Sequence, residues 1–461
     1  MRAVSARDLI ERNERGAALC DQARVWPYHP DLLANPVPRY TSYPTAADFG
    51  PLNSAAYRQA LQDADGDISL YVHIPFCERI CHYCGCNTGA ANRQQRLQSY
   101  LEALHHEIAA VAAFLPRGAR VGRVSFGGGS PNAIDPADFT RLVDALHSAF
   151  PLWDPAFSIE LDPRSLTSAW ASAIAETGIE RASLGVQTFA PHCQQAIGRI
   201  QSEDSIVAAV DLLREAGVTS LNFDLMYGLP GQSLHDVEDS LQRTRVLGAD
   251  RVALFGYAHV PHLVPRQRAI DASNLPDQET RFRMAALGFG YFVTHGYTPV
   301  GFDHFAAAGR DPLATASMTG RVHRNFQGFT DDAAPILIGL GASAISSFPH
   351  LLVQNEKNSG RYRMIASQGE LASNRGIVRN ADDRHRGAVI ERLLCDSRAF
   401  LGPALAADAA CALQPFIVRG LASLDHEWLT VTADGLPYAR TIAALFDPYR
   451  TQAPGRFSSA V

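Results

Sequence analysis

Between about residues 68 and 260, short runs with β-strand composition alternate with longer segments of helical periodicity. The pattern predicts strands at residues 68–75, 123–128, 157–162, 181–187, 219–226 and 250–257. Predicted helices lie between them, including 95–114, 136–150, 202–216 and 234–246. Six strand–helix units in succession indicate an α/β fold with a parallel sheet and right-handed crossovers, either open or curled into a partial barrel.

The predicted strands alternate between apolar and polar residues. Tyr71, Glu160, Gln187 and Asp224 fall on the polar faces of their strands, opposite apolar neighbours. A parallel strand with helices on both sides is expected to be apolar on both faces, and polar groups are costly to bury without partners. We therefore expect a wide, curved sheet whose concave face lines a polar cavity, with ligands near the carboxyl ends of the strands.

The flanking segments have a different character. Residues 35–45 hold three prolines and two tyrosines, which predicts an extended arm. Downstream, a helix is expected at 278–295 and a strand near 299–303. The tail from about 378 is helix-rich, with a hairpin at 424–432 that gives it a winged-helix-like pattern. We divide the chain into an N-terminal arm (1–60), a main domain (61–375) and a small, mainly helical C-terminal domain (376–461).

Composition restricts the class of protein. Apolar residues make up 46% of the 461 residues and charged residues 19%, as in a soluble globular protein, and the net charge of −6 argues against broad nucleic-acid binding. The chain shows neither a membrane-length apolar run nor the apolar core of a signal peptide. Four of the eight cysteines are crowded into ten positions, which does not suit a disulfide framework. We expect a reducing, cytoplasmic compartment.

The crowded cysteines are the strongest chemical signal. Cys77, Cys81 and Cys84 form a CxxxCxxC loop after the first predicted strand, and Cys86 follows. A cubane iron–sulfur cluster usually takes four cysteines, so three leave one iron open to a ligand. The loop, with an aromatic residue before its third cysteine, resembles the signature of radical S-adenosylmethionine enzymes. A four-cysteine zinc site is the alternative, which the spacing disfavours because such sites usually combine two separated CxxC pairs.

Polar groups at the ends of other predicted strands are suited to bind S-adenosylmethionine. The glycine-rich segment 126–131 ends the second predicted strand and is expected to offer free N–H groups to the cofactor carboxylate. Glu160 is a candidate to bind the amino group of S-adenosylmethionine, and Asp224 is a candidate to bind its ribose hydroxyls. Gln187 and Arg199 are candidate polar neighbours. Any one of these groups could be merely structural.

Taken together, these motifs resemble the oxygen-independent coproporphyrinogen III oxidases, which are radical S-adenosylmethionine enzymes. The match runs from about Pro38 to the C-terminus. It includes residues 39–45, 71–88, 127–131, 160–164, 184–187, 224–230, 257–259, 301–305, 323–328 and 341–346. The resemblance implies a partial (β/α)₆ barrel with a smaller helical C-terminal domain. Two departures are Ser130, where threonine is common, and Tyr83, where phenylalanine is common.

The resemblance also implies cofactors and their ligands. It assigns one [4Fe–4S] cluster to Cys77, Cys81 and Cys84, and two molecules of S-adenosylmethionine to the adjoining pocket. The first molecule is assigned to Tyr71, Gly128, Glu160 and Ile345. The second is assigned to Tyr83, Gly129, Ser130, Gln187, Arg199, Asp224 and Ala258, with Phe326 and Gln327 in the same pocket. Tyr71 and Cys86 are the candidate catalytic residues, and Cys86 is not a cluster ligand.

The activity implied is part of haem biosynthesis. A 5′-deoxyadenosyl radical mechanism would convert the propionates on rings A and B of coproporphyrinogen III to vinyl groups, giving protoporphyrinogen IX. The resemblance further implies a monomer that takes electrons from an unidentified reduced donor. Since the substrate is a tetra-anion, cations are needed near the cavity, and Arg39, His323 and Arg324 are candidates.

Two other functions fit the same fold. A haem-binding chaperone usually has phenylalanine at the position of Cys86 and lacks the arm at 39–44, so both features favour the oxidase. A radical enzyme that degrades haem or transfers a methyl group is the third alternative, which product mass would distinguish.

Overall fold

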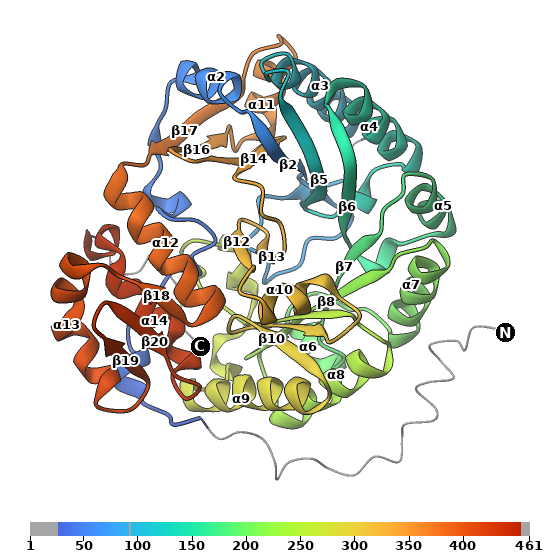
Figure 1. Cartoon of the computed structure of the whole chain (residues 1–461). Helices are drawn as coiled ribbons and strands as arrows, with labels where there is room; N and C mark the ends of the chain where they lie inside the picture. The colour runs from blue at the N-terminus through green and yellow to red at the C-terminus, as the bar shows by residue number, and fades with distance from the viewer. Residues whose placement is uncertain (1–25, 92–93, 453–461) are drawn as a thin grey trace.

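The computed structural model describes residues 26–91 and 94–452, and within them one mixed sheet of thirteen strands forms the centre of the molecule (Figure 1). In spatial order the strands are β1 (Gly50–Pro51), β17 (Ser373–Val378), β16 (Leu351–Asn355), β15 (Ile345–Phe348), β14 (Ile336–Leu340), β2 (Gly66–Ile74), β5 (Ala119–Gly128), β6 (Leu152–Leu161), β7 (Arg181–Gln187), β8 (Ser220–Tyr227), β9 (Arg251–Gly256), β11 (His304–Ala307) and β10 (Tyr297–Val300). Neighbours from β14 to β9 pair in parallel, and the pairs beyond them are antiparallel.

Strand–helix units build the curved part of the sheet, as the sequence predicts. Each of β2, β5, β6, β7, β8 and β9 is followed by at least one helix on the outer face (Figure 1). These helices are α3 (Gln94–Ala112), α4 (Pro136–Ala149), α5 (Ser168–Glu176), α6 (Pro191–Ala196), α7 (Glu203–Glu215), α8 (Leu234–Val246) and α9 (Gln278–Thr294). The partial (β/α)₆ barrel is therefore confirmed. Strand β7 and helix α8 cover the same residues as predicted, and the other predicted bounds shift by up to five residues.

Local sequence sets where several of these helices begin. The side chain of Asp135 accepts a hydrogen bond from the N–H of Ala137, and Pro136 occupies the first turn of α4. At the start of α8, Ser233 and Asp236 form a reciprocal capping box. Such caps satisfy backbone donors that the first helical turn leaves free, which fixes the chain direction as it leaves each strand.

The sheet extends further than the sequence suggested. No strand is predicted between residues 330 and 377, whereas the structure places β14 to β17 there. All five residues of β14 are buried, so the strand lacks the alternation that identifies half-buried strands. The strand expected near 299–303 ends at Val300, and it pairs with β11 as a hairpin.

The polar faces of the strands do line a cavity, as predicted. Ser125, Ser158, Ser183 and Asn222 all face a space of about 320 Å³, which we call the concave-face cavity. The hydroxyl of Ser158 donates to that of Ser125 at 2.7 Å across β6 and β5. The apolar residues of the same strands are buried in the main core beneath the outer helices.

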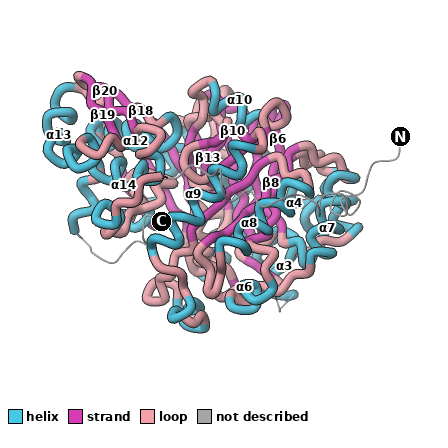
Figure 2. Tube along the Cα trace, turned by 90° about the horizontal axis from the view of Figure 1, so that it is seen from below, coloured by secondary structure: helices cyan, strands magenta, loops and turns pink. Residues whose placement is uncertain are grey.

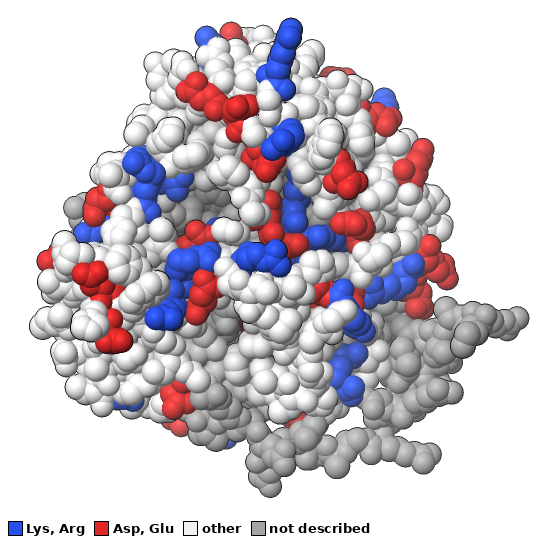
Figure 3. All heavy atoms as spheres, viewed as in Figure 1, with Lys and Arg blue, Asp and Glu red and all other residues white. Residues whose placement is uncertain are grey.

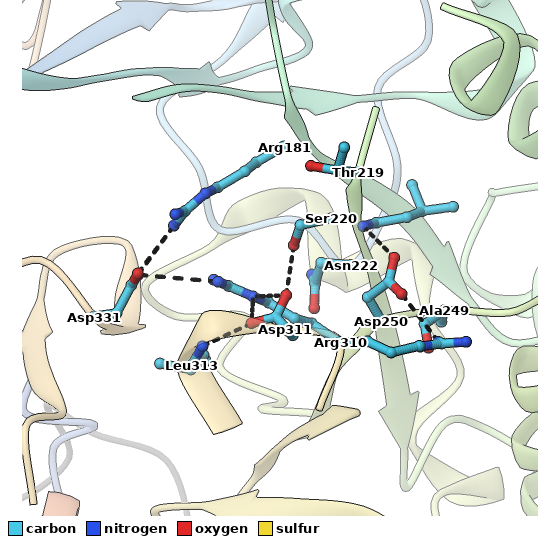
Figure 4. Close-up of polar contacts among 12 residues, drawn as sticks. Arg181, Thr219, Ser220, Asn222, Ala249, Asp250, Arg310, Asp311, Leu313 and Asp331 are labelled. Carbon is cyan, nitrogen blue, oxygen red and sulfur yellow. Dashed lines mark hydrogen bonds and ion pairs between the residues drawn. The ribbon is translucent and has the colours of Figure 1, made fainter. Parts of the chain in front are cut away.

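Paired charges lie near the amino-terminal ends of the barrel strands. Arg181 at the start of β7 contacts Asp331 at 3.0 Å, and the hydroxyl of Ser220 donates to Asp311 at 2.6 Å (Figure 4). Arg123 from β5 also contacts Asp331, at 2.8 Å. Figure 3 shows basic and acidic side chains interspersed on this side of the molecule rather than a patch of one sign.

The C-terminal elements pack beside the barrel (Figure 2). They are α12 (Ala381–Asp396), β18 (Arg398–Phe400), α13 (Pro403–Ile417), β19 (Ala422–Asp425), β20 (Trp428–Val431) and α14 (Ala439–Ala443). The predicted hairpin at 424–432 corresponds to β19 and β20, and β18 completes a three-stranded sheet.

The N-terminal arm connects the barrel and the C-terminal elements. Residues 34–45 lack helix and strand, and the hydroxyl of Tyr40 donates to Asp447 at 2.9 Å. Helix α2 (Ser54–Gln62) continues past residue 60, and residues 1–25 of the predicted arm lie outside the described residues. Within the described ranges, every helix is too short or too polar to cross a membrane.

Candidate active site

The cysteine loop leaves the end of β2 and is closed at its base by two short strands. β3 (Phe76–Cys77) pairs in parallel with β4 (Gly89–Ala90), and the N–H of Ala91 donates to the carbonyl of Cys77 at 2.9 Å. The N–H of His82 donates to the carbonyl of Ile197 at 2.9 Å, which fastens the loop to the end of α6. The loop is thus fixed both at its base and near its middle.

A cavity of about 440 Å³, the cysteine cavity, lies at the carboxyl ends of the barrel strands. Cys77, Cys81, Cys84 and Cys86 all line it. So do nine of the residues predicted to bind cofactor: Tyr83, Gly128, Gly129, Ser130, Glu160, Gln187, Arg199, Asp224 and Ala258. Glu160 and Asp224 also line the concave-face cavity, so the two spaces adjoin.

Tyr71 and Ile345 are placed beside this cavity rather than in its lining. The hydroxyl of Tyr71 lies 3.2 Å from Nδ1 of His73, and Tyr71 pairs with Gly339 of β14. A Cβ on Gly339 would lie 2.6 Å from the carbonyl oxygen of Ile345, so these segments are in close contact. Burial, followed by the charge of Glu160, raises the pKa of Tyr71 well above its usual range. The phenol therefore stays protonated at neutral pH.

Phe326 and Gln327 form the tip of a hairpin between β12 (His323–Asn325) and β13 (Gly328–Thr330). Gln327 lines the concave-face cavity. Phe326 instead lines a separate space of about 440 Å³ beside Tyr40 and α12. The structure thus brings Gln327 toward the predicted cofactor pocket, whereas the side chain of Phe326 lies in the neighbouring space.

The glycine-rich segment does not offer the free N–H groups that we expected. The N–H of Gly129 donates to Ile74 at 2.8 Å, that of Ser130 to Phe76 at 2.7 Å, and that of Gly128 to the carboxylate of Glu160 at 3.2 Å. A Cβ on Gly129 would lie 2.3 Å from the carbonyl oxygen of Phe76. The glycines therefore allow β5 to approach the cysteine loop, and their backbone donors are already used.

Two guanidinium groups surround the sulfur of Cys81. Nη1 of Arg199 lies 3.4 Å from this sulfur and Nη2 of Arg164 lies 3.6 Å from it. Asp162 bridges both arginines, at 2.6 Å from Arg164 and 3.3 Å from Arg199. Arg199 also donates to the carbonyl of Gly185 at 2.6 Å. Both guanidinium groups therefore place positive charge beside the sulfur of Cys81.

The remaining thiols influence one another. A hydrogen bond between Cys86 and Cys84 lowers the pKa of Cys84 to about 6 and raises that of Cys86. Burial, together with the neighbouring cysteines, raises the pKa of Cys77 to about 12. Several thiolates are thus unfavourable side by side unless a cationic centre joins them, as cluster iron does.

Two carboxylates, Glu160 and Asp224, line the cavity, and neither forms an ion pair with a basic side chain of the described residues. Burial and the charge of Asp224 raise the pKa of Glu160 to about 7. Burial also raises the pKa of Asp224, although Asn222 donates to it at 2.9 Å and Ser183 at 3.1 Å. A cationic ligand beside this pair would relieve the cost of their ionisation.

The geometry does not support a single metal ion in the cysteine loop. Among the described residues, the one group of three His, Cys, Asp or Glu ligand atoms within 4.8 Å of one another is His192, Cys193 and Asp236, outside this loop. One zinc ion needs all of its ligands at about 2.0–2.3 Å. Ligands of a cubane cluster bind different irons, so they do not need to meet within bonding distance of one metal ion.

Several residues of the site were not identified from the sequence. The amide of Gln267 donates to the carbonyls of Tyr83 at 2.9 Å and Ala258 at 3.0 Å, which joins the cysteine loop to the end of β9. No sequence signal marks Gln267. His73 and Asp162 could have been found, because both lie on the polar faces of predicted strands.

Comparison with known proteins agrees with this site. Residues 71–244 match the family model of the Radical SAM superfamily. The oxygen-independent coproporphyrinogen III oxidase of Paracoccus denitrificans is 41% identical and covers 91% of this chain and 95% of its own length. The protein of the same description from Escherichia coli is 36% identical, covering 90% and 93%.

A solved structure gives the same result for the fold. The coproporphyrinogen III oxidase of Escherichia coli, described as a radical SAM enzyme, matches with a TM-score of 0.86 at 35% identity. The match covers 92% of this chain and 100% of that one. Fold and site thus define a radical SAM enzyme. Within that class, the chain belongs to the oxygen-independent coproporphyrinogen III oxidases.

Proposed function

We propose that this enzyme converts the ring A and ring B propionates of coproporphyrinogen III to vinyl groups, giving protoporphyrinogen IX for haem synthesis without oxygen. Each conversion removes one carbon dioxide, one hydrogen atom and one electron from a propionate. The observation that supports the proposal most is that the cysteine loop, Glu160, Asp224 and Arg199 line a single cavity in a chain that closely matches oxidases of this description.

We assign a [4Fe–4S] cluster to Cys77, Cys81 and Cys84, which line one cavity with two guanidinium groups beside the sulfur of Cys81. S-adenosylmethionine bound there would supply the radical chemistry that removes hydrogen from an unactivated carbon. Two such molecules are part of the proposal. The carboxylate of Glu160 would hold the cofactor amino group, Asp224 the ribose hydroxyls, and Arg199 an anionic part.

Tyr71 and Cys86 are the proposed catalytic residues. Because the Tyr71 phenol stays protonated, it serves as a hydrogen-bond donor beside Glu160. Cys86 is exposed, lines the cysteine cavity and is hydrogen-bonded to Cys84, which supports a role next to the cluster loop. We also propose a cytoplasmic monomer, a reduced one-electron donor, and domains bounded at residues 60 and 375.

An anaerobic assay of the reconstituted full-length enzyme tests this function. The cluster is rebuilt and counted as iron per chain, and coproporphyrinogen III, S-adenosylmethionine and dithionite are supplied. We expect a product in which two propionates have lost carbon dioxide and become vinyl groups. An intact cluster with no vinyl product refutes the proposal, and stable retention of haem by the same preparation would point to a chaperone.

A further inference from the structure

Four arginines from four distant segments gather beside the cysteine cavity; we call them the arginine cluster. Arg39 comes from the N-terminal arm, Arg281 from α9, Arg324 from β12 and Arg440 from α14. The charges of Arg324 and Arg440 both act on Asp303, and the two guanidinium groups each lie 5.4 Å from the ring centre of Phe302. The cluster thus joins arm, barrel and C-terminal elements.

Backbone carbonyls, rather than carboxylates, bind three of these guanidinium groups. Arg39 donates to Gly256 at 2.7 Å and Arg281 to Tyr257 at 2.6 Å, both at the end of β9. Arg324 donates to the carbonyls of Tyr40 and Arg39, each at 3.0 Å. Nε of Arg281 and Nη1 of Arg324 are buried with no hydrogen-bond partner among the described residues.

Within the part of the chain that the structure describes, the carboxylates of Asp303 and Glu391 act on the cluster. Asp303 lies among these arginines, and it already accepts a hydrogen bond from His304 at 2.7 Å. Burial lowers the pKa of Arg281, Arg324 and Arg440, the last to about 10, and the charge of Arg39 lowers each further. The charge of Glu391 raises the pKa of Arg324, but the Glu391 carboxylate also contacts Nδ1 of His323 at 3.2 Å. Positive charges gathered partly out of water favour the binding of an anion among them.

A small cavity lies inside the cluster. Its volume is about 50 Å³, and Arg39, Arg440, Asp303 and Trp26 are among its lining residues. A water molecule needs roughly 10–15 Å³ of such space, so this cavity has room for a carboxylate and is too small for a pyrrole ring. Arg39 lines the cysteine cavity as well, so the small cavity borders the proposed reaction site.

We propose that the arginine cluster binds substrate carboxylates, holding propionate groups that are not reacting while another propionate lies at the reaction site. This inference rests on the proposed function, because it takes its ligand from there. It adds Arg281 and Arg440, which sequence reasoning did not identify, to Arg39 and Arg324. Of the earlier candidate cations, His323 is instead paired with Glu391.

Binding of coproporphyrin III, a stable tetracarboxylate, to the cluster-loaded full-length enzyme tests this proposal. We expect Arg281→Met and Arg440→Met each to weaken binding roughly tenfold or more, since each removes charge-assisted hydrogen bonds. Wild type should bind the tetramethyl ester much more weakly, and the variants should not weaken ester binding further. Arg419→Met is the matched control, because Arg419 is a C-terminal arginine paired with Asp31 at 2.9 Å.

Steady-state kinetics give a second readout. The KM for coproporphyrinogen III should rise in Arg440→Met with kcat nearly unchanged, and Arg440→Lys should recover part of the loss. Equal losses for acid and ester, or a KM equal to that of wild type, would overturn the carboxylate site. Should Arg440→Met fail to fold, the wild-type comparison of acid and ester and the Arg440→Lys variant decide the question.

The two proposals fail in different ways. If wild type makes vinyl product while the variants bind and turn over normally, the carboxylate site is wrong and the function stands. If wild type makes no vinyl product but binds coproporphyrin III through these arginines, the function is wrong and the carboxylate site stands.

Discussion

Arg199 and Cys81 are joined by a hydrogen bond in which Nη1 of the guanidinium group lies 3.4 Å from the sulfur. Arg199 follows α6, and Cys81 lies in the loop after β2, so the contact connects opposite halves of the barrel. The same arginine donates to Gly185 of β7 and contacts Asp162. The charge beside a proposed cluster ligand is therefore fixed by the barrel itself.

Replacing Arg199 by methionine should make the reduction potential of the cluster more negative. Hydrogen bonds and charge near ligand sulfurs help to set this potential, and one charged bond corresponds to a shift on the order of tens of millivolts. A redox titration followed by electron paramagnetic resonance measures it. Arg214→Met, which removes an arginine paired with Asp250 at 2.6 Å, is the control and should leave the potential unchanged. Equal potentials in all three proteins would contradict the assignment of Cys81.

Affinity for S-adenosylmethionine should rise with pH because a cationic ligand competes with the proton on Glu160. Its folded pKa of about 7 lies above the ordinary value, so the carboxyl holds a proton at pH 6 and is ionised at pH 8. Roughly tenfold tighter binding is expected across that range. Calorimetric titrations of wild type and Glu160→Gln measure it, and the variant should lack this part of the pH dependence.

Glu107 provides the matched control for that experiment. Burial raises its pKa to about 7 as well, but its partners are Tyr362, Asn355 and Gly341, outside the cavity. The folded state binds a proton to each glutamate more readily than the unfolded state, so this contribution to stability falls as pH rises toward 7. Glu107→Gln should alter that stability profile and keep the pH dependence of cofactor binding. A flat binding profile in Glu107→Gln would contradict the role of Glu160.

The four loop cysteines should separate into two classes when each is replaced by serine. Loss of Cys77, Cys81 or Cys84 should abolish cluster assembly, because each supplies one of three iron ligands. Cys86→Ser should retain the iron content of wild type and lose product formation. Iron analysis and product chromatography make the comparison. A cluster lost in Cys86→Ser but kept in Cys77→Ser would reverse the assignment.

Gly129→Ala should disturb the cysteine loop, because the new methyl group would lie 2.3 Å from the carbonyl oxygen of Phe76. We expect a loss of about 1–3 kcal/mol in the free energy of unfolding and poor cluster incorporation. Gly85→Ala is the control in the same loop, since its Cβ would meet only Val264, at 3.7 Å. Chemical denaturation measures both variants. Equal stability would show that the loop can move away from β5.

Residue patterns predicted the parts of the site that depend on strand parity. Glu160 and Asp224 could be placed on the concave face because side chains alternate along each strand. The use of the Gly129 N–H could not be predicted, because it depends on how closely the cysteine loop packs against β5. The complete arginine cluster could not be predicted either, because Arg281 and Arg440 come together only when α9 and α14 pack against the barrel.

The most direct test of the central claim is to follow isotope from substrate to cofactor in one anaerobic turnover. Coproporphyrinogen III deuterated at the β-carbons of its propionates is given to the reconstituted enzyme with S-adenosylmethionine and dithionite. Deuterium is expected in 5′-deoxyadenosine, with one labelled molecule formed for each vinyl group. Vinyl product with unlabelled 5′-deoxyadenosine, or no product from an enzyme carrying a full cluster on Cys77, Cys81 and Cys84, would contradict it.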